Sequence, residues 1–503
     1  MSAAQGRMTP RGTEKTCRKC GSSFAVLHPY QADSVDAISA ALFSTQAVLY
    51  VGVTGSGKTA IAEALTARET ARGGRVTFLA DRQELVRQAH DRIGGAVLMG
   101  SYRPTPDVTR PENPGVTIAS VATLARRTEA PDATLVFADE AHLYAAASFR
   151  RVLDAYRSSG ARIVGLTATP ARLDGQGLGL LFDTVVQGPS AEWLIANDYL
   201  VPVVHKAPTG AWWDAVRLQG GDFDTQGLEQ AGSAVLKDIA ARWASLGGIL
   251  RPTLVFASTK QHAAKLADEF SRLLFLHGLP PAEVITDDTP ASVRRSVRDR
   301  LQSGALWVAV TVGVLGTGFD APAVSCIVMA RPTLSWALYL QQGGRGLRTW
   351  PGKQNLLLID CAGNSLRHGY LTKPFAVDLD GINRKHRRAT AGLTTCRKCW
   401  RVYEWTLAAC PECGAAKPRG AERKVREVDG QLVELTAAQQ WAERAAAGDQ
   451  VRKLAKWIRE GEERGWKPAA PMARFKGMFS RWPKREEIEQ ARRMAASARR
   501  RTR

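Results

Sequence analysis

A complete phosphate-binding loop near the start of the chain limits the possible folds more than any other feature. Residues 52–59 read Gly-Val-Thr-Gly-Ser-Gly-Lys-Thr and match the pattern G-x-x-x-x-G-K-[ST]. An apolar run at 47–51 precedes the loop and a helix-forming segment at 61–65 follows it, which is the strand–loop–helix context that the motif requires. The alternative, a glycine-rich turn that matches by chance, is disfavoured by these flanking segments.

The loop supplies the groups that bind a nucleoside phosphate. Its glycines allow backbone N–H groups to close around phosphate oxygens, and the Lys58 ammonium adds a point charge. The Thr59 hydroxyl can ligate Mg²⁺. The candidate nucleotide-binding residues of the loop are Thr54, Gly55, Ser56, Gly57, Lys58 and Thr59.

Short β-rich runs alternate with helical segments in two separate stretches of the chain. The runs of the first stretch lie at 47–53, 76–80, 116–119, 134–138 and 162–166. Those of the second lie at 253–257, 282–285, 306–310, 325–329 and 355–359. Continuous apolar strands separated by helices predict parallel sheets that are covered on both faces. At 503 residues the chain is also too long for one ordinary core, so we predict two tandem α/β domains.

The composition between these stretches suggests where the domains begin and end. The segment at 201–247 shows no clear repeat, and basic residues gather at 381–394. The expected organisation is an N-terminal segment (1–27), a first α/β domain (28–200), a connector (201–247), a second α/β domain (248–380), a basic linker (381–394), a small cysteine-containing domain (395–416) and a basic helical tail (417–503).

The charge of the chain favours a polyanionic partner. The formal net charge is +21, for which nucleic acid is the commonest partner and an anionic membrane surface the alternative. Residues 451–503 alone hold 17 Lys and Arg against 6 Asp and Glu, a net charge of +11. The aromatic residues between these charges could stack on bases or form the core of an amphipathic helical bundle.

The N-terminal residues lack the apolar core of a signal peptide, and no run of about 18 apolar residues occurs, so we expect a cytoplasmic protein without a membrane span.

An acid pair and a pair of hydroxyls follow two strands of the first domain. Asp139 and Glu140 end an apolar run: Asp139 could hold Mg²⁺ through water, and Glu140 could orient and deprotonate an attacking water. His142 could sense the nucleotide state. Acidic residues in the first turn of a helix are the ordinary alternative, but the phosphate-binding loop upstream favours the nucleotide site. Thr167 and Thr169 follow the next run, either as an ordinary turn or as a segment that couples the nucleotide site to a track.

Two further groups could complete the nucleotide site. Arg345 and Arg348 lie three residues apart and therefore share one helix face. From a second domain they could reach a γ-phosphate, and such a contact accelerates phosphoryl transfer about 10³–10⁵-fold. The alternative is that the two arginines are simply solvated. Tyr30 and Gln31 precede the loop, where the tyrosine could stack on a ring and the glutamine could pair with adenine N6 and N7.

Cysteine pairs predict a metal site. Six of the eight cysteines stand in C-x-x-C pairs, which suit metal binding in a reducing compartment better than disulfides. Two pairs at short spacing can wrap one tetrahedral Zn²⁺ and would leave no open position for catalysis. The candidate zinc ligands are Cys396, Cys399, Cys410 and Cys413.

The other four cysteines carry weaker signals. Cys17 and Cys20 form a third pair with no second pair near it, and could be half of a site or complete one with ligands from elsewhere. Cys326 and Cys361 lie in strand-like apolar runs, where we expect them to be core residues.

The whole series of motifs resembles that of superfamily 2 helicases of the DEAD/DEAH-box class. The segments that carry this resemblance are 30–31, 55–59, 78–86, 120–124, 139–142, 167–170, 254–258, 316–320 and 341–348. Within the class, the chain is most similar to bacterial RadD-type repair helicases and related phage helicases, over about residues 27–370. The distinctive stretches are 170–174 with 188–190, 330–333 with 338–342, and 361–364 with 367–369.

The resemblance implies two RecA-like domains with ATP in the cleft between them. Lys58, Thr59, Asp139 and Glu140 would serve hydrolysis, while Arg345 and Arg348 would complete the site from the second domain. The resemblance also implies that Gln341 contacts the nucleotide or the water, and that Asp320 links the cleft to the nucleic-acid groove. Gly318, Asp320 and Gln341 are therefore further candidate residues of the nucleotide site. One departure is Thr317, which stands where the family often has Glu, so no role for an acid is expected there.

These observations predict an ATP-dependent DNA helicase or translocase that acts in repair, recombination or phage replication. Its expected cofactors are ATP, Mg²⁺ and Zn²⁺, and its expected partners are single-stranded or branched DNA and repair or replication proteins that bind the C-terminal region. An RNA helicase and an ATP-gated binding module that does not unwind are the alternatives.

Overall fold

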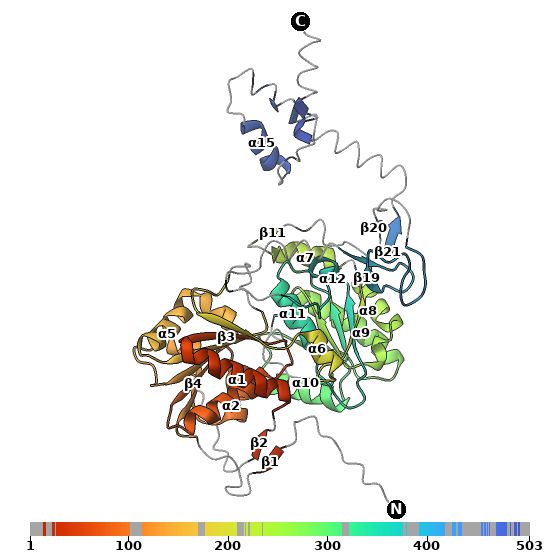
Figure 1. Ribbon diagram of the computed structural model, residues 1–503. Coiled ribbons are helices and arrows are strands. Elements are labelled where there is room, and N and C mark those ends of the chain that lie inside the picture. The colour runs from red at the N-terminus through yellow and green to blue at the C-terminus, as the bar shows by residue number, and fades with distance from the viewer. Residues whose placement is uncertain are drawn as a thin grey trace, which may run out of the picture. The chain divides into compact units, whose positions relative to one another are not determined.

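The computed structural model describes residues 27–100, 113–169, 177–208, 222–313, 321–375 and 392–417, apart from position 234 and some side chains between 225 and 233. It also describes short pieces at 14–16, 23–25, 216, 218–219, 379, 425–428 and 431–434, and parts of 454–492. The chain divides into two compact units, one formed by Met1–Arg419 with Asp429–Gln431 and the other by Gly420–Val428 with Leu432–Arg503 (Figure 1).

The first unit contains a seven-stranded parallel sheet of order β5-β6-β4-β7-β8-β3-β9. Its strands are β3 (Ala47–Val51), β4 (Val76–Ala80), β5 (Ala96–Leu98), β6 (Val116–Ser120), β7 (Leu135–Asp139), β8 (Arg162–Thr167) and β9 (Thr184–Gln187). Its helices are α1 (Pro29–Ser44), α2 (Lys58–Thr70), α3 (Gln83–Ile93), α4 (Val121–Leu124), η1 (Ala141–Ala145), α5 (Ala147–Ser158) and α6 (Ala191–Ala196).

These segments fold as parallel strands because both faces of the sheet bury apolar side chains. In β3, Val48 and Tyr50 belong to one core cluster, whereas Leu49 and Val51 belong to another. Successive residues of a strand point to opposite faces, so a continuous apolar run can support helices on both sides. The loop at 52–57 therefore leaves the carboxyl end of β3 and enters α2.

The first unit also contains a six-stranded parallel sheet of order β10-β17-β16-β13-β15-β14. Its strands are β10 (Val203–Lys206), β13 (Thr253–Phe256), β14 (Glu283–Ile285), β15 (Val308–Thr311), β16 (Cys326–Met329) and β17 (Leu356–Asp360). Its helices are α8 (Leu236–Ser245), η2 (Gly248–Leu250), α9 (Lys260–Leu276), α10 (Ala291–Ser303), α11 (Trp336–Gly344) and α12 (Asn364–His368).

The second sheet follows the same burial rule as the first. Leu254 and Phe256 of β13 join one core cluster, and Val255 joins the cluster on the other face. Cys326 and Cys361 are buried in that second cluster, which confirms them as core residues. The prediction of two tandem parallel-sheet domains is therefore confirmed.

The connector expected at 201–247 belongs in part to the second domain, which corrects that boundary. β10 pairs in parallel with β17, so that Val203 lies opposite Leu356. α8 packs against α9, and its fully buried Trp243 donates a hydrogen bond from Nε1 to Thr253 Oγ1 at 3.0 Å. The local pattern did not indicate this because the partner strand of β10 lies far later in the chain.

Smaller elements complete the described part of the chain. The remaining elements are β1 (Glu14–Thr16), β2 (Ser23–Ala25), β11 (Leu218–Gln219), β12 (Asp222–Phe223), α7 (Thr225–Ser233), β18 (Leu393–Thr395), β19 (Val402–Glu404), β20 (Val425–Val428), β21 (Gln431–Glu434) and α15 (Ala470–Phe479). Cys17 and Cys20 lie outside the described residues. Among the helices that the structure describes, none combines the length and the apolar character needed to cross a membrane.

The C-terminal unit contains a small apolar core of its own. The core is formed by Leu454, Ala455, Trp457, Ile458, Phe475 and Ala491. Trp457 is 6% exposed and Phe475 is fully buried, so these two aromatic rings act as core residues, in keeping with the amphipathic-bundle alternative. The side chains of Trp466, Phe479 and Trp482 lie outside the described residues.

Replacement of Trp243 by alanine should lower the free energy of unfolding of the second α/β domain by about 3–5 kcal/mol, because it opens a large cavity between α8 and α9. Chemical denaturation monitored by circular dichroism measures this change. Trp405 is 57% exposed, and its replacement by alanine should change the same quantity by less than about 0.5 kcal/mol. Equal effects of the two variants would contradict the place of α8 in this core.

Candidate active site

The phosphate-binding loop takes the backbone conformation that its glycines predict. Gly55 and Gly57 have φ values of 92° and 81°, and α2 begins at Lys58. The φ of 81° at Gly57 favours glycine, and a Cβ placed there would also lie 2.3 Å from Gln31 Nε2. Lys58 Nζ donates a hydrogen bond to Gly52 O at 3.1 Å, which holds the ammonium across the loop. Burial lowers the pKa of Lys58, and the charges of Glu140 and Asp139 oppose that shift.

Tyr30 and Gln31 support this loop from α1. Tyr30 Oη and Gln31 Nε2 both donate to Ser56 O, at 2.9 and 3.1 Å. Gln31 Oε1 accepts a hydrogen bond from His28 N at 3.0 Å. The Tyr30 ring is packed against Tyr199, with ring centroids 4.7 Å apart. The structure thus gives both side chains a bracing contact that the sequence did not indicate, and their contacts with adenine stay predictions.

The acid pair lies at the carboxyl end of β7, beside the loop. Asp139 is the last residue of the strand, and its Oδ1 accepts a hydrogen bond from Glu140 N at 3.0 Å. Glu140 has a φ of 50°, an uncommon conformation for a residue with a side chain. Its Oε2 lies 3.5 Å from His142 Nδ1. Burial, followed by the neighbouring Glu140 charge, raises the pKa of Asp139 to about 7.

The acid pair fits a divalent cation. A carboxyl group whose pKa is raised by burial and by a second acid is stabilised in its charged form when a cation binds. Oxygen ligands such as the Asp139 carboxylate and the Thr59 hydroxyl are those that Mg²⁺ prefers. When bound, the ion would neutralise charge on phosphate oxygens, while Asp139 and Thr59 would hold it.

The second domain brings two arginines to this loop. Arg345 is the C-cap of α11, and Arg348 lies beyond the helix in a β-bridge with Leu200. The prediction that the two arginines share one helix face is therefore wrong, because the helix ends at Gly344. A Cβ on Gly344 would lie 2.5 Å from Thr54 Cβ, and a Cβ on Gly55 would lie 3.2 Å from Arg348 Cγ. The end of α11 therefore touches the loop. Burial lowers the pKa of Arg345, and the charge of Glu140 opposes this shift, which places the guanidinium within range of the acid pair.

Of the other predicted site residues, the structure describes some and does not describe others. Gln341 on α11 is buried, and its Nε2 has no hydrogen-bond partner among the described residues, as suits a side chain that would contact a nucleotide or a water. Thr167, the last residue of β8, and Thr169 just beyond it are fully buried, and Thr167 Oγ1 accepts a hydrogen bond from Thr169 N at 3.1 Å. Gly318 and Asp320 lie outside the described residues.

Sequence reasoning missed two contacts between the domains. Glu84 on α3 forms an ion pair with Arg294 on α10, and no pattern marks it because its partners stand on separate helices. The approach of Gly344 to Thr54 was also missed, although the glycine doublet before Arg345 is a signal that could have indicated it.

The four predicted metal ligands converge on one point. Their sulfur atoms all lie within 4.8 Å of one another. Cys396 and Cys413 are 3.5 Å apart, and Cys399 and Cys410 are 3.6 Å apart. A tetrahedral ion with metal–sulfur bonds of about 2.3 Å requires sulfur atoms about 3.8 Å apart, so these residues fit one four-coordinate metal ion.

The cysteine domain is attached to the second sheet. Lys206 at the end of β10 donates to Cys399 O at 3.1 Å and forms an ion pair with Glu412. The Arg242 guanidinium of α8 lies over the Trp400 ring, 4.6 Å from its centroid. The metal site is therefore linked to the second α/β domain by contacts on both of its cysteine pairs.

Two family models match the two α/β domains. The model of the type III restriction enzyme res subunit matches residues 24–172, and that of the helicase conserved C-terminal domain matches residues 246–349. The chain is 27% identical to the 51.5 kDa protein of a Lactococcus phage (isolate 7-9), over 63% of this chain and 65% of that protein. It is 28% identical to the putative ATP-dependent helicase IRC3 of Saccharomyces cerevisiae, over 70% of this chain and 53% of that protein. The chain thus spans less than two thirds of these relatives.

Solved structures share the fold. A fragment of a putative HsdR subunit of a type I restriction enzyme from Vibrio vulnificus YJ016 superposes with a TM-score of 0.53 at 21% identity, covering 71% of this chain and 67% of that one. The ATP-dependent type ISP restriction-modification enzyme LlaBIII bound to DNA superposes with a TM-score of 0.50 at 12% identity, covering 74% of this chain and 30% of that one. At these identities the likeness shows the fold alone.

Binding of Mg²⁺ together with a nucleotide should release protons near pH 7. The Asp139 carboxyl, with its pKa raised to about 7, is about half protonated at that pH, and a cation favours the charged form. We expect release of about 0.5 proton per site at pH 7 and almost none at pH 9. Titration calorimetry in buffers of different ionisation enthalpy measures the release. An unchanged release in Asp139→Asn would show that another group carries the proton.

Proposed function

We propose that this chain, a superfamily 2 helicase with one family model matched to each of its two parallel-sheet domains, hydrolyses ATP in the cleft between those domains. The hydrolysis drives movement along DNA, or remodelling of DNA, in repair, recombination or phage replication. The resemblance of its motifs to those of RadD-type helicases supports the repair role.

The observation that carries the proposal is that the two domains face each other across the phosphate-binding loop. The loop amides and Lys58 bind the β- and γ-phosphates, and Thr59 and Asp139 hold Mg²⁺. Glu140 orients the attacking water and takes its proton, and His142, 3.5 Å away, responds to the state of that carboxylate. Charge that develops on the transferring phosphoryl group is stabilised by guanidinium groups.

In this proposal the second domain supplies those guanidinium groups. Arg345 and Arg348 reach the γ-phosphate from the end of α11, and Gln341 contacts the nucleotide or the water. Closure of the cleft on ATP and its opening after hydrolysis move the two domains relative to each other. Thr167 and Thr169 couple that motion to the nucleic acid.

DNA is the substrate that the observations favour. The net charge of +21 supports a nucleic-acid partner, because Lys and Arg side chains neutralise phosphates. The resemblance of the motifs to those of RadD-type repair helicases supports DNA over RNA. RNA is the alternative, because a motor that contacts the sugar–phosphate backbone does not by itself indicate the sugar.

Replacement of Lys58 or Arg345 by alanine should lower the rate of ATP hydrolysis by about 10³-fold or more, because each removes a charge that stabilises the transferring phosphoryl group. Binding of nucleic acid should remain. Arg150 on α5 is a half-buried arginine that pairs with Asp154, and its replacement by alanine serves as the control with unchanged turnover. The assay measures steady-state hydrolysis with single-stranded, duplex and forked DNA and with RNA of equal length.

Each arm of this assay has a defined meaning. Strongest stimulation by RNA would establish the RNA helicase instead. Turnover without strand separation or displacement of a bound roadblock would favour the ATP-gated binding module. Full turnover in Lys58→Ala would show that the ATP site is assigned wrongly.

We also propose that the cysteine domain is a zinc ribbon, since four thiolates at tetrahedral spacing match a structural Zn²⁺ site. The purified protein should contain one Zn²⁺ per chain, and Cys413→Ser should lose it and lower the melting temperature of the second domain, because Lys206 then loses its ordered partners. Metal analysis and differential scanning calorimetry measure both effects. Cys20→Ser is the matched control: loss of zinc there would show a second site that uses Cys17 and Cys20.

A further inference from the structure

We propose that Asp222 is a positioning residue for hydrolysis: it fixes the start of α11, the helix whose far end carries Arg345 and Arg348 to the phosphate-binding loop. This inference rests on the proposed role of the two arginines. Asp222 lies on β12, in the segment before the second α/β repeat, and none of the motifs above includes it.

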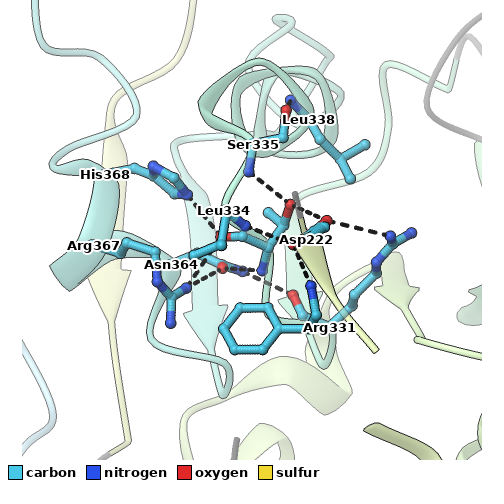
Figure 2. A network of polar contacts seen from close by, with 10 residues as sticks. Asp222, Arg331, Leu334, Ser335, Leu338, Asn364, Arg367 and His368 are labelled. Carbon is cyan, nitrogen blue, oxygen red and sulfur yellow. Dashed lines mark hydrogen bonds and ion pairs between the residues drawn. The ribbon is translucent and has the colours of Figure 1, made fainter. Parts of the chain in front are cut away.

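The carboxylate of Asp222 binds the loop that leads into α11 (Figure 2). Its Oδ2 accepts a hydrogen bond from Thr333 Oγ1 at 2.9 Å, and its Oδ1 accepts one from Leu334 N at 2.8 Å. Arg331 Nη2 lies 3.6 Å from Oδ2. One side chain thus holds three successive parts of this loop, all within five residues of the first residue of α11.

Thr333 is the centre of this network. It is fully buried, and its Oγ1 also accepts a hydrogen bond from Ser335 N at 3.0 Å. Ser335 is the N-cap of α11, and its Oγ accepts from Leu338 N at 3.2 Å. The contact of Asp222 with Thr333 is therefore one hydrogen bond away from the cap that sets where the helix begins.

The opposite side of the same loop is held by α12. Asn364 Oδ1 accepts a hydrogen bond from Thr333 N at 3.0 Å, and Asn364 Nδ2 donates to Arg331 O at 2.9 Å. Arg367 and His368 contact Thr333 O at 3.2 and 2.9 Å. Figure 2 shows Asn364, Arg367 and His368 gathered around the loop on which Asp222 also converges.

Asp222 and the α12 residues belong to different parts of the fold. α12 follows β17 and belongs to the frame of the second sheet, whereas β12 pairs with β11 in a separate two-stranded sheet. Phe223 anchors the same hairpin, because the Arg367 guanidinium lies 5.3 Å from the centroid of its ring. The orientation of α11 therefore depends on a carboxylate supplied from outside the sheet that carries the helix.

A change in the position of the start of α11 would displace the arginines at its far end, because the helix is short and stiff. Its nine residues form a rod of about 13 Å at 1.5 Å per residue. Gly344 at its end touches Thr54 of the loop, so little room exists to absorb a tilt. A misplacement of about 1 Å in a catalytic group can cost about 10²-fold in rate. Loss of the Asp222 contacts should therefore lower turnover and leave ATP binding by the first domain intact.

The test compares Asp222→Ala with Asp224→Ala in the full-length protein. Asp224 lies two residues away, and its Oδ2 accepts a hydrogen bond from Gly227 N at 2.8 Å, with no part in the network at α11. We expect Asp222→Ala to lower kcat for ATP by about tenfold to a hundredfold, with the Kd of a fluorescent ATP analogue changed less than about twofold. Asp224→Ala should leave both quantities unchanged.

Further variants separate positioning from loss of folding. Asp222→Asn keeps one oxygen acceptor and should retain more turnover than Asp222→Ala. Thr333→Val removes the hydroxyl that Asp222 binds, so the double variant with Asp222→Ala should be no slower than the slower single variant. Hydrogen exchange in residues 336–344 should rise in Asp222→Ala and not in Asp224→Ala. If Asp222→Ala does not fold, Asp222→Asn and Thr333→Val decide the question by the same kcat and Kd.

Two outcomes would overturn the inference. The first is a folded Asp222→Ala whose kcat equals that of Asp224→Ala, and the second is a loss of kcat matched by an equal loss of ATP affinity. Arg345→Ala distinguishes a failure of this inference from a failure of the proposed function. If Arg345→Ala abolishes turnover and Asp222→Ala has no effect, only the positioning role is wrong. If Arg345→Ala is fully active, the proposed function of the cleft is wrong.

Discussion

The nucleotide cleft depends on the close approach of α11 to the phosphate-binding loop. A side chain at Gly344 would collide with Thr54, and one at Gly55 would press on Arg348. The charges of Glu140, Asp139 and both arginines act on the pKa of Lys58, so this contact gathers three cationic groups and two acids around the loop. Cationic groups directed at one point attract a polyphosphate. The same packing that joins the domains therefore also favours the ligand that we propose for the cleft.

Much of the fold was predictable because parallel strands that are buried on both faces appear as continuous apolar runs. β4 has the bounds that the sequence predicts, and the other predicted strands agree to within a few residues. The missed strands are short or lie at sheet edges: the residues of β9 are half-buried or exposed, and in β10 only His205 and Lys206 are buried. β10 also pairs with a strand that follows it by most of a domain. No local pattern contains that information.

The candidate site was predictable to a different depth at each residue. The order of the motifs indicated Lys58, Asp139 and Arg345, because phosphate and cation chemistry requires particular side chains at fixed points. The bracing of Ser56 O by Tyr30 and Gln31 was not predictable, because it is a contact with the main chain. The contacts of Asp222 were not predictable for a related reason. Its partners are a hydroxyl and a backbone N–H, and neither produces a recognisable pattern in the sequence.

The attachment of the cysteine domain shows how tertiary contacts can offset local strain. Trp400 follows the first cysteine pair with a φ of 62°, the conformation that Gly414 takes after the second pair with a φ of 67°. Such a conformation costs about 1–3 kcal/mol for a residue with a side chain. The Trp400 ring stacks on Arg242, and Trp400 O accepts a hydrogen bond from Ala207 N at 2.8 Å. The Trp400 side chain thus joins the cysteine domain to the second α/β domain, and these contacts offset the cost of the backbone conformation.

The same strands connect this attachment to the arginine-bearing helix. β10 carries Lys206 at its end and pairs with β17, and β17 ends at Asp360, whose Oδ1 accepts a hydrogen bond from Ala362 N at 3.1 Å as the chain turns into α12. His205 of β10 lies 3.4 Å from Ser365 Oγ, through its Nδ1. Burial lowers the pKa of His205 to about 3, so this contact stays neutral at physiological pH and involves no charge. The metal site, the edge strand and α12 thus form one continuous support, and α11 takes its position from that support on one side and from Asp222 on the other.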